Sequence, residues 1–164
     1  MHPSDFSPLI ESCCADVLDS MYFTSVVDVR HELDAEVAPP AGLAFSLHFE
    51  GDVHGIFGLS LDTAAARTLA ANFLGEEETT LTPEEIAEVI GELANMLCGS
   101  VVSRLEGTSK FVLTHPEPFA HAGAPPDGSP MLVSTLNTDI GPVQVWVALD
   151  PAASAPEPME EARA

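Results

Sequence analysis

The segment from Thr82 to Gly107 predicts a long amphipathic helix, and this helix limits the fold more than any other feature. Thr82 is the expected N-cap, Pro83 follows at the first helical position, and Glu85 completes a capping box. Because one face is apolar along the whole length, the helix has to pack against a large apolar surface. That face consists of Ile86, Val89, Ile90, Leu93, Leu97, Val101 and Leu105.

Alternating apolar residues supply a sheet for that surface. Residues 43–49 and 53–61 alternate on either side of Glu50-Gly51-Asp52, which predicts a β-hairpin. Further strands are expected at 23–32, 110–114, 119–121, 131–137 and 143–149. Ser7 and Pro8 are expected to open a first helix, and Asp62 a second that ends at Gly75.

Strands that follow one another as hairpins form antiparallel sheets. The sequence therefore predicts an α+β fold with two layers, a largely antiparallel sheet with long helices packed on it. With 164 residues and 46% apolar content, residues 1–150 are expected to form a single domain. Residues 151–164, rich in Ala, Pro and Glu, are expected to be a disordered acidic tail after the Pro- and Gly-rich loop 122–130.

The charge of the chain excludes several classes of partner. Asp and Glu number 26 against 5 Lys and Arg, a formal net charge of -21. Such a surface repels phosphate backbones and anionic lipids, so nucleic acids and membranes are not expected partners. The sequence has no apolar run of membrane-spanning length and no basic region of a signal peptide, so a cytoplasmic location is expected. The three cysteines and six histidines have no disulfide or metal-site spacing.

The polar stripe of the long helix carries the candidate site. Glu92 and Asn95, three residues apart, share one helical face, and Asn is an unfavourable residue in mid-helix. The amide of Asn95 is unable to act as a base but can hold a water through its oxygen and its nitrogen. In phosphoryl transfer, an amide that orients the attacking water is valuable, because the chemistry depends mostly on positioning. A carboxylate beside it would repel the phosphate, and it makes chemical sense only if it pairs with a cation that the substrate brings. The same stripe contains Glu88, Gly99 and Ser103, and Gly99 leaves room for close approach to the backbone.

Two alternatives fit the same stripe. Glu and Asn at this spacing on an acidic helix are also typical of plain solvated surface. Glu84, Glu85 and Glu88 could bind Mg²⁺ weakly, as in a metal-dependent hydrolase. Acidic residues are, however, already favoured in a first helical turn by the helix dipole.

Residues 53–106 resemble the CheX/CheC family of chemotaxis phosphatases. Three segments carry the resemblance, and with the final hairpin it extends over about two-thirds of the chain. They are His54-Gly55-Ile56-Phe57-Gly58-Leu59-Ser60-Leu61, Phe73-Leu74-Gly75-Glu76, and Ile90-Gly91-Glu92-Leu93-Ala94-Asn95-Met96-Leu97-Cys98-Gly99.

This resemblance implies a CheC-like fold and a protein phosphatase that removes phosphate from the aspartate of a CheY-like response regulator. Asn95 would orient the attacking water, and Glu92 would pair with the active-site lysine of the regulator. Glu88, Gly99 and Ser103 are expected to contact that partner. The chain would need no cofactor or metal of its own, because Mg²⁺ would belong to the regulator.

A single Glu-x-x-Asn motif resembles the CheX-type arrangement, which implies a homodimer with residues 131–137 or a neighbouring strand as a possible edge. The alternative is a non-catalytic module of the same fold that binds a regulator, as in flagellar switch components.

Overall fold

The computed structural model describes residues 1–33, 42–105, 110–118 and 130–149. Its centre is a seven-stranded sheet in the order β1-β6-β7-β3-β2-β4, with β5 also paired to β2, and every pairing in it is antiparallel. The strands are β1 (Val26–Leu33), β2 (Gly42–Glu50), β3 (Gly55–Asp62), β4 (Val112–Leu113), β5 (Glu117–Pro118), β6 (Met131–Thr138) and β7 (Gly141–Leu149).

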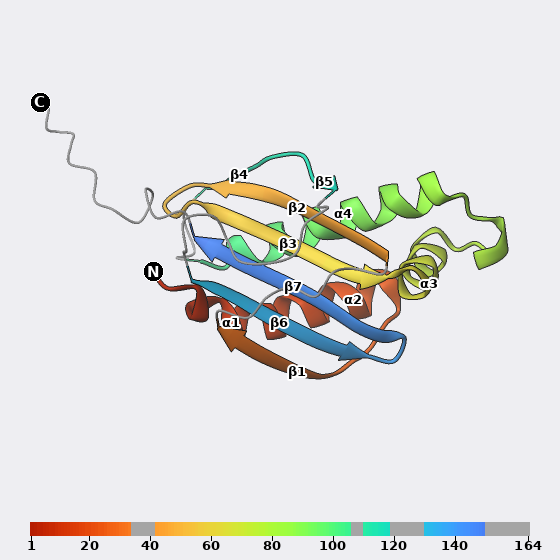
Figure 1. The fold of residues 1–164 in the computed structure, drawn as a ribbon, viewed down its shortest axis with the longest axis horizontal. Coiled ribbons are helices and arrows are strands. Elements are labelled where there is room, and N and C mark those ends of the chain that lie inside the picture. The colour runs from red at the N-terminus through yellow and green to blue at the C-terminus, as the bar shows by residue number, and fades with distance from the viewer. Residues whose placement is uncertain (34–41, 106–109, 119–129, 150–164) are drawn as a thin grey trace, which may run out of the picture.

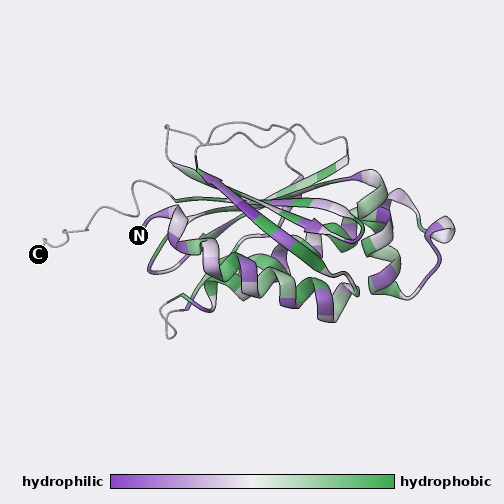
Figure 2. Ribbon diagram, turned by 90° about the horizontal axis from the view of Figure 1, so that it is seen from below, coloured by the Kyte–Doolittle hydropathy of each residue, from purple (hydrophilic) through white to green (hydrophobic). Residues whose placement is uncertain are grey.

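The helices lie together on one side of this sheet (Figures 1 and 2). Figure 2 shows hydrophobic residues on the sides of the helices that face the strands. This arrangement confirms the predicted α+β fold with two layers. The helical segments are η1 (Pro3–Phe6), α1 (Ser7–Leu9), η2 (Ile10–Cys14), α2 (Ala15–Tyr22), α3 (Thr63–Leu74), η3 (Glu78–Thr80) and α4 (Pro83–Val102).

The main core fills the space between the helices and the sheet. Alternate residues of β2 and β3, such as Leu47, Phe57 and Leu59, are fully or almost fully buried there against α4. The opposite face of the sheet has a smaller buried cluster. Within it, Trp146 lies over Gly58, where an added Cβ would come within 2.0 Å of the indole ring. Gly58 thus lets the only tryptophan lie flat on the sheet.

The first helix differs from the expectation in its start and its form. It begins at Pro3, with His2 as N-cap, so Ser7 and Pro8 lie inside it. The segment Ile10–Cys14 is a π-helix, which shifts the register and buries both Cys13 and Cys14. Sequence periodicity missed this because a π-segment breaks the regular spacing of 3.6 residues.

Several strand boundaries also differ. Phe23 is the left-handed C-cap of α2 rather than the first residue of a strand, and it is exposed. Val53 lies in the turn before β3, and only Val112–Leu113 pairs in the segment expected at 110–114. Most of the loop 122–130, the strand expected at 119–121, Gly107 and the tail 151–164 lie outside the described residues.

Of the two options expected for a dimer edge, residues 131–137 are excluded and a neighbouring strand remains. Strand β6 is bonded to β1 on one side and to β7 on the other, so its backbone groups are already paired. Among the described strands, β1 has an unpaired edge, and its Val27 is exposed. A dimer that extended this sheet would therefore use β1 or the β4–β5 side, and the homodimer itself stays a prediction.

Candidate functional site

The start of helix α4 is fixed by hydrogen bonds at its N-cap residue, Thr82. The Thr82 hydroxyl accepts a hydrogen bond from the backbone N–H of Glu85 at 3.1 Å. The Glu85 carboxylate accepts one from the N–H of Thr82 at 2.9 Å. This is the predicted capping box, and the apolar stripe behind it is buried against the sheet and α3. The polar stripe is consequently fixed on the outer side of the helix.

Glu92 and Asn95 lie on that outer side, but they are not equally exposed. Glu92 is exposed, whereas Asn95 is half-buried. The reason lies in the neighbours of the helix one turn away in each direction. Gly91 faces the ring of Phe45 on β2, and Gly99 faces Leu113 on β4. Asn95 lies midway between these glycines along the helix, beside the segment that joins β4 to β5.

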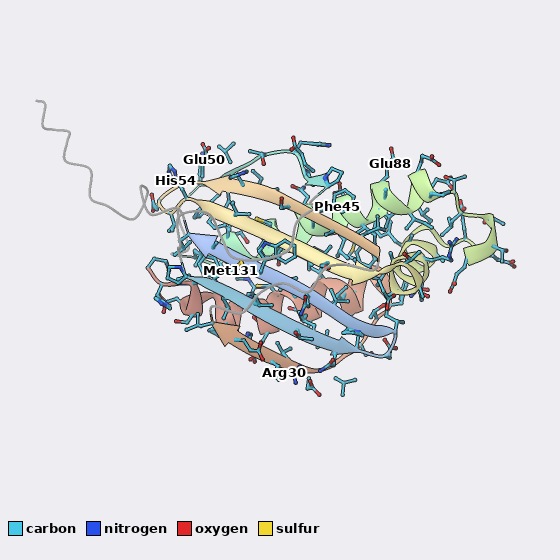
Figure 3. All side chains as sticks on the ribbon, viewed as in Figure 1. Arg30, Phe45, Glu50, His54, Glu88 and Met131 are labelled. Carbon is cyan, nitrogen blue, oxygen red and sulfur yellow. The ribbon has the colours of Figure 1, made fainter. Side chains whose placement is uncertain are left out.

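An open groove with a volume of about 1070 Å³ runs between α4 and this segment. Both candidate residues line it, together with an acidic row that continues toward the start of the helix. Glu84, Glu88 and Glu92 follow one another at intervals of four residues, about 6 Å apart along the axis. Figure 3 labels Glu88 on the outer side of α4 and Phe45 on the neighbouring strand. The other lining residues are Phe45, Phe73, Leu74, Ala87, Val89, Gly91, Leu113, Thr114, His115, Pro116 and Pro118.

The charges of the groove have no cationic partner among the described residues. The one ion pair among the described residues joins Glu11 to His31, which lie outside the groove. Glu88 and Glu92 are both exposed and form no such pair. The groove therefore combines an apolar lining with unpaired negative charge, which favours a partner that brings a cation beside apolar side chains.

Gly99 and Ser103 extend the stripe beyond the groove. Among the described residues, an added Cβ at Gly99 would come within 4 Å of Leu113 alone, at 3.7 Å, so there is room for close approach at this half-buried position. Ser103 is the C-cap of α4, and its hydroxyl donates to the carbonyl of Ser100 at 3.0 Å. Neither residue lines the groove. The structure therefore brings together Glu88, Glu92 and Asn95, whereas Gly99 lies one turn and Ser103 two turns beyond Asn95.

Tyr22 is a polar residue beneath the site that the sequence did not indicate. Its side chain is fully buried at the end of α2, and its ring stacks on Phe73, with centroids 4.9 Å apart. No described residue forms a hydrogen bond with the hydroxyl. Burial raises the pKa of this phenol, and the negative charge of Glu92 raises it further.

Among the described residues, no three His, Cys, Asp or Glu side chains are grouped so that they could hold a metal ion, and Glu84, Glu85 and Glu88 form no such group. None of the described helices has the length and apolar character needed to cross a membrane. Cys13, Cys14 and Cys98 are buried free thiols, as predicted for the first two. Burial raises the pKa of Cys98 to about 12, which makes its thiol a poor nucleophile near neutral pH.

The family model of the chemotaxis phosphatase CheX matches residues 44–134, which contain most of β2 and the whole of β3, α3 and α4. The chain belongs to the CheX family. No curated protein matches the sequence. The family assignment confirms the resemblance seen in the motif segments. It does not test the roles of individual residues.

Solved structures show that the fold agrees with this family. A chemotaxis protein CheX from Desulfovibrio desulfuricans superposes with a TM-score of 0.73 at 15% identity, over 89% of this chain and 99% of the other. A CheC-like superfamily protein from Shewanella gives 0.73 at 17% identity, over 89% and 97%. CheX of Borrelia burgdorferi, solved in a complex with CheY, BeF3 and Mg²⁺, gives 0.68 at 19% identity, over 88% and 97%. At these identities the likeness concerns the fold.

Proposed function

We propose that this chain is a phosphatase that hydrolyses the aspartyl phosphate of a CheY-like response regulator. The observation that carries the proposal is that Glu92 and Asn95 lie together on one wall of an open groove, in a chain of the CheX family. The Borrelia relative, which was solved in a complex with CheY, BeF3 and Mg²⁺, supports a partner of this kind. The groove opens to solvent, as a site that receives another protein has to.

In this proposal the attacking water is held by Asn95. Its carbonyl oxygen accepts a hydrogen bond from the water, which points the water oxygen at phosphorus in line with the acyl oxygen. A P–O bond forms to the water as the P–O bond to the regulator's aspartate breaks. The aspartate leaves as a carboxylate, and the proton of the water ends on inorganic phosphate. Positioning is the main contribution a protein makes to such a transfer.

Glu92 has a separate role in this proposal. Its exposed carboxylate pairs with the active-site lysine of the regulator and fixes the orientation of the two proteins. Glu88, one turn away, adds negative charge on the same wall of the groove. Gly99 and Ser103 contact the regulator beyond the groove, where Gly99 leaves the helix backbone accessible. Mg²⁺ is held by the regulator, so the chain supplies the water-orienting amide and the docking surface.

The test is the rate of phosphate loss from several phosphorylated regulators with Mg²⁺. Asn95→Ala should reduce the rate at saturating regulator by about 100-fold, roughly 2.7 kcal/mol of barrier. Asn137→Ala serves as the control, because it removes an amide on β6 that bonds to Asp28, far from the groove in the sheet order. An Asn95→Ala variant as active as the parent would refute the mechanism. Tight binding by the parent without faster phosphate loss would instead favour the non-catalytic binding module.

Glu92→Gln separates docking from chemistry. It should raise KM with little change in kcat, because the lysine contact holds the two proteins together before and during the reaction. Asp19→Asn removes one negative charge from the exposed side of α2 and is the matched control. If both variants raised KM equally, total charge rather than a specific ion pair would explain the effect.

A further inference from the structure

Two contacts of α4 fix the level of Asn95 along the groove. Gly91, one turn before Asn95, faces the ring of Phe45 on β2, which is 3.5 Å from the position of an added Cβ. Gly99, one turn after Asn95, faces Leu113 on β4 at 3.7 Å in the same way. The helix advances about 12 Å between the two glycines, so Asn95 lies about 6 Å along the axis from either contact.

The segment that joins β4 to β5 covers the same distance on the other wall of the groove. Strand β4 pairs with β2 at Phe49, and β5 pairs with it at Phe45, about 13 Å back along β2. His115 lies midway between β4 and β5 in the sequence. It is therefore placed at the level of Asn95, and both residues line the groove.

The backbone at His115 is held in place, whereas its ring is free. The N–H of the preceding residue, Thr114, donates to the carbonyl of His48 on β2 at 2.9 Å. The hydroxyl of Thr114 accepts from the N–H of His48, also at 2.9 Å. Pro116 follows and favours an extended backbone at His115. His115 is exposed, and its ring forms no hydrogen bond or ion pair with another described residue.

A phosphoryl group that enters this groove requires hydrogen-bond donors. Three glutamates line the groove, and neither Lys nor Arg is among the described residues that do so. Of these lining residues, Asn95, Thr114 and His115 carry side-chain donors. In the proposed function the amide of Asn95 holds the water, and the hydroxyl of Thr114 is held against β2. The imidazole of His115 remains, and it presents an N–H in either protonation state.

We infer that His115 is a binding residue for the phosphoryl group, whose ring N–H donates a hydrogen bond to a phosphoryl oxygen of the docked regulator. The inference rests on the proposed function, because it is Asn95 that places the phosphorus at this level of the groove. Hydrogen bonds to an ionised acceptor are the strong ones. Since this acceptor exists only on the phosphorylated regulator, His115 lets the chain distinguish that form from the unphosphorylated one.

His115→Ala tests the inference by binding alone. Kd is measured for a regulator with beryllofluoride, which stands in for the phosphoryl group, and for the same regulator without it. The regulator used is the one whose beryllofluoride form binds the parent most tightly. For that form His115→Ala should raise Kd about tenfold, whereas Kd for the untreated regulator should change less than twofold. His115→Gln keeps an N–H donor and should raise Kd less than His115→Ala does.

His48→Ala is the matched control. His48 is also an exposed histidine, but it does not line the groove. Its hydrogen bonds to Thr114 use the backbone of His48, so the substitution leaves them in place. Both Kd values should equal those of the parent, and thermal unfolding should show that His115→Ala and His48→Ala are as stable as the parent.

Three results would overturn the inference. The first is an equal rise of Kd for both forms of the regulator in His115→Ala, because the ring would then contact the protein and not the phosphoryl group. The second is an unchanged Kd for the beryllofluoride form, and the third is a parent that binds both forms equally. All three leave the proposed phosphatase intact if phosphate loss depends on Asn95. A parent that prefers the beryllofluoride form through His115 but does not accelerate phosphate loss would refute the proposed function alone.

Discussion

Replacing Gly99 with alanine separates the stability of α4 from the docking of a regulator. Glycine within a helix costs about 0.5–1 kcal/mol relative to alanine, and the lower value applies here because α4 ends three residues later. The new methyl group would lie 3.7 Å from Leu113, an ordinary contact. Half-burial of that group adds about 0.4 kcal/mol. Gly99→Ala should therefore stabilise the free protein by about 1 kcal/mol, or roughly 2–4 °C in Tm.

The effect on docking should have the opposite sign. If a regulator approaches the helix backbone at Gly99, the added methyl group fills the space that the regulator needs. Overpacking of one methyl group at a close contact costs about 1–3 kcal/mol, so KM should rise about tenfold or more. The value of kcat should change little, because Asn95 lies a full turn away from the new group.

The assays are thermal unfolding of the free chain and steady-state phosphate release over a range of regulator concentrations. Ser100→Ala is the matched control, since it lies one residue further along the helix and also exchanges a weaker helix former for alanine. It should raise Tm slightly and leave KM unchanged. A lower Tm for Gly99→Ala would refute the reasoning from the Leu113 contact. A raised Tm with an unchanged KM would remove Gly99 from the docking surface.

Two further predictions concern the scaffold of the site. Thr82→Ala breaks the capping box and should destabilise the protein by about 1 kcal/mol, seen as a fall in Tm of roughly 2–4 °C that Thr82→Ser largely restores. The pKa of Cys98 is about 12 in the folded protein against 9.0 for an ordinary thiol, so thiols of the unfolded chain ionise first as pH rises. Stability should therefore fall between about pH 9 and pH 12, more steeply in the parent than in Cys98→Ala, and rapid labelling of the native thiols at pH 8 would contradict the burial of Cys98.

The parts of the fold that depend on local chemistry were predictable. The capping box of Thr82 and Glu85 and the alternation in β2 and β3 appear in the structure because neighbouring residues specify them. The order of the strands was not predictable, because β1 pairs with β6 about 100 residues away. For the same reason the sequence did not indicate that residues 131–137 lie inside the sheet, which leaves a neighbouring strand as the expected dimer edge.

The candidate site likewise has one part that the sequence predicts and another that depends on distant segments. Glu92 and Asn95 were found because both lie on one helix at a spacing that places them side by side. Their surroundings come from distant segments: Leu113 and Pro116 from the connection after α4, and Phe73 from α3. No spacing relates these residues in sequence, so only the packing of α2, α3 and β2 around α4 brings them together.

The unequal exposure of Glu92 and Asn95 fits the two roles proposed for them. A residue that orients water has to hold one geometry within a fraction of an ångström, and such precision comes from side chains restricted by their neighbours. Asn95 is half-buried in the wall of the groove, which leaves its side chain less free than that of Glu92. A residue that pairs with an incoming lysine needs accessibility more than precision, because attraction between charges varies slowly with distance. Glu92 is exposed, as the proposed pairing with an incoming lysine requires. On this proposal, the capture of the partner needs only an accessible charge, whereas the orientation of the water needs an amide that is less free to move.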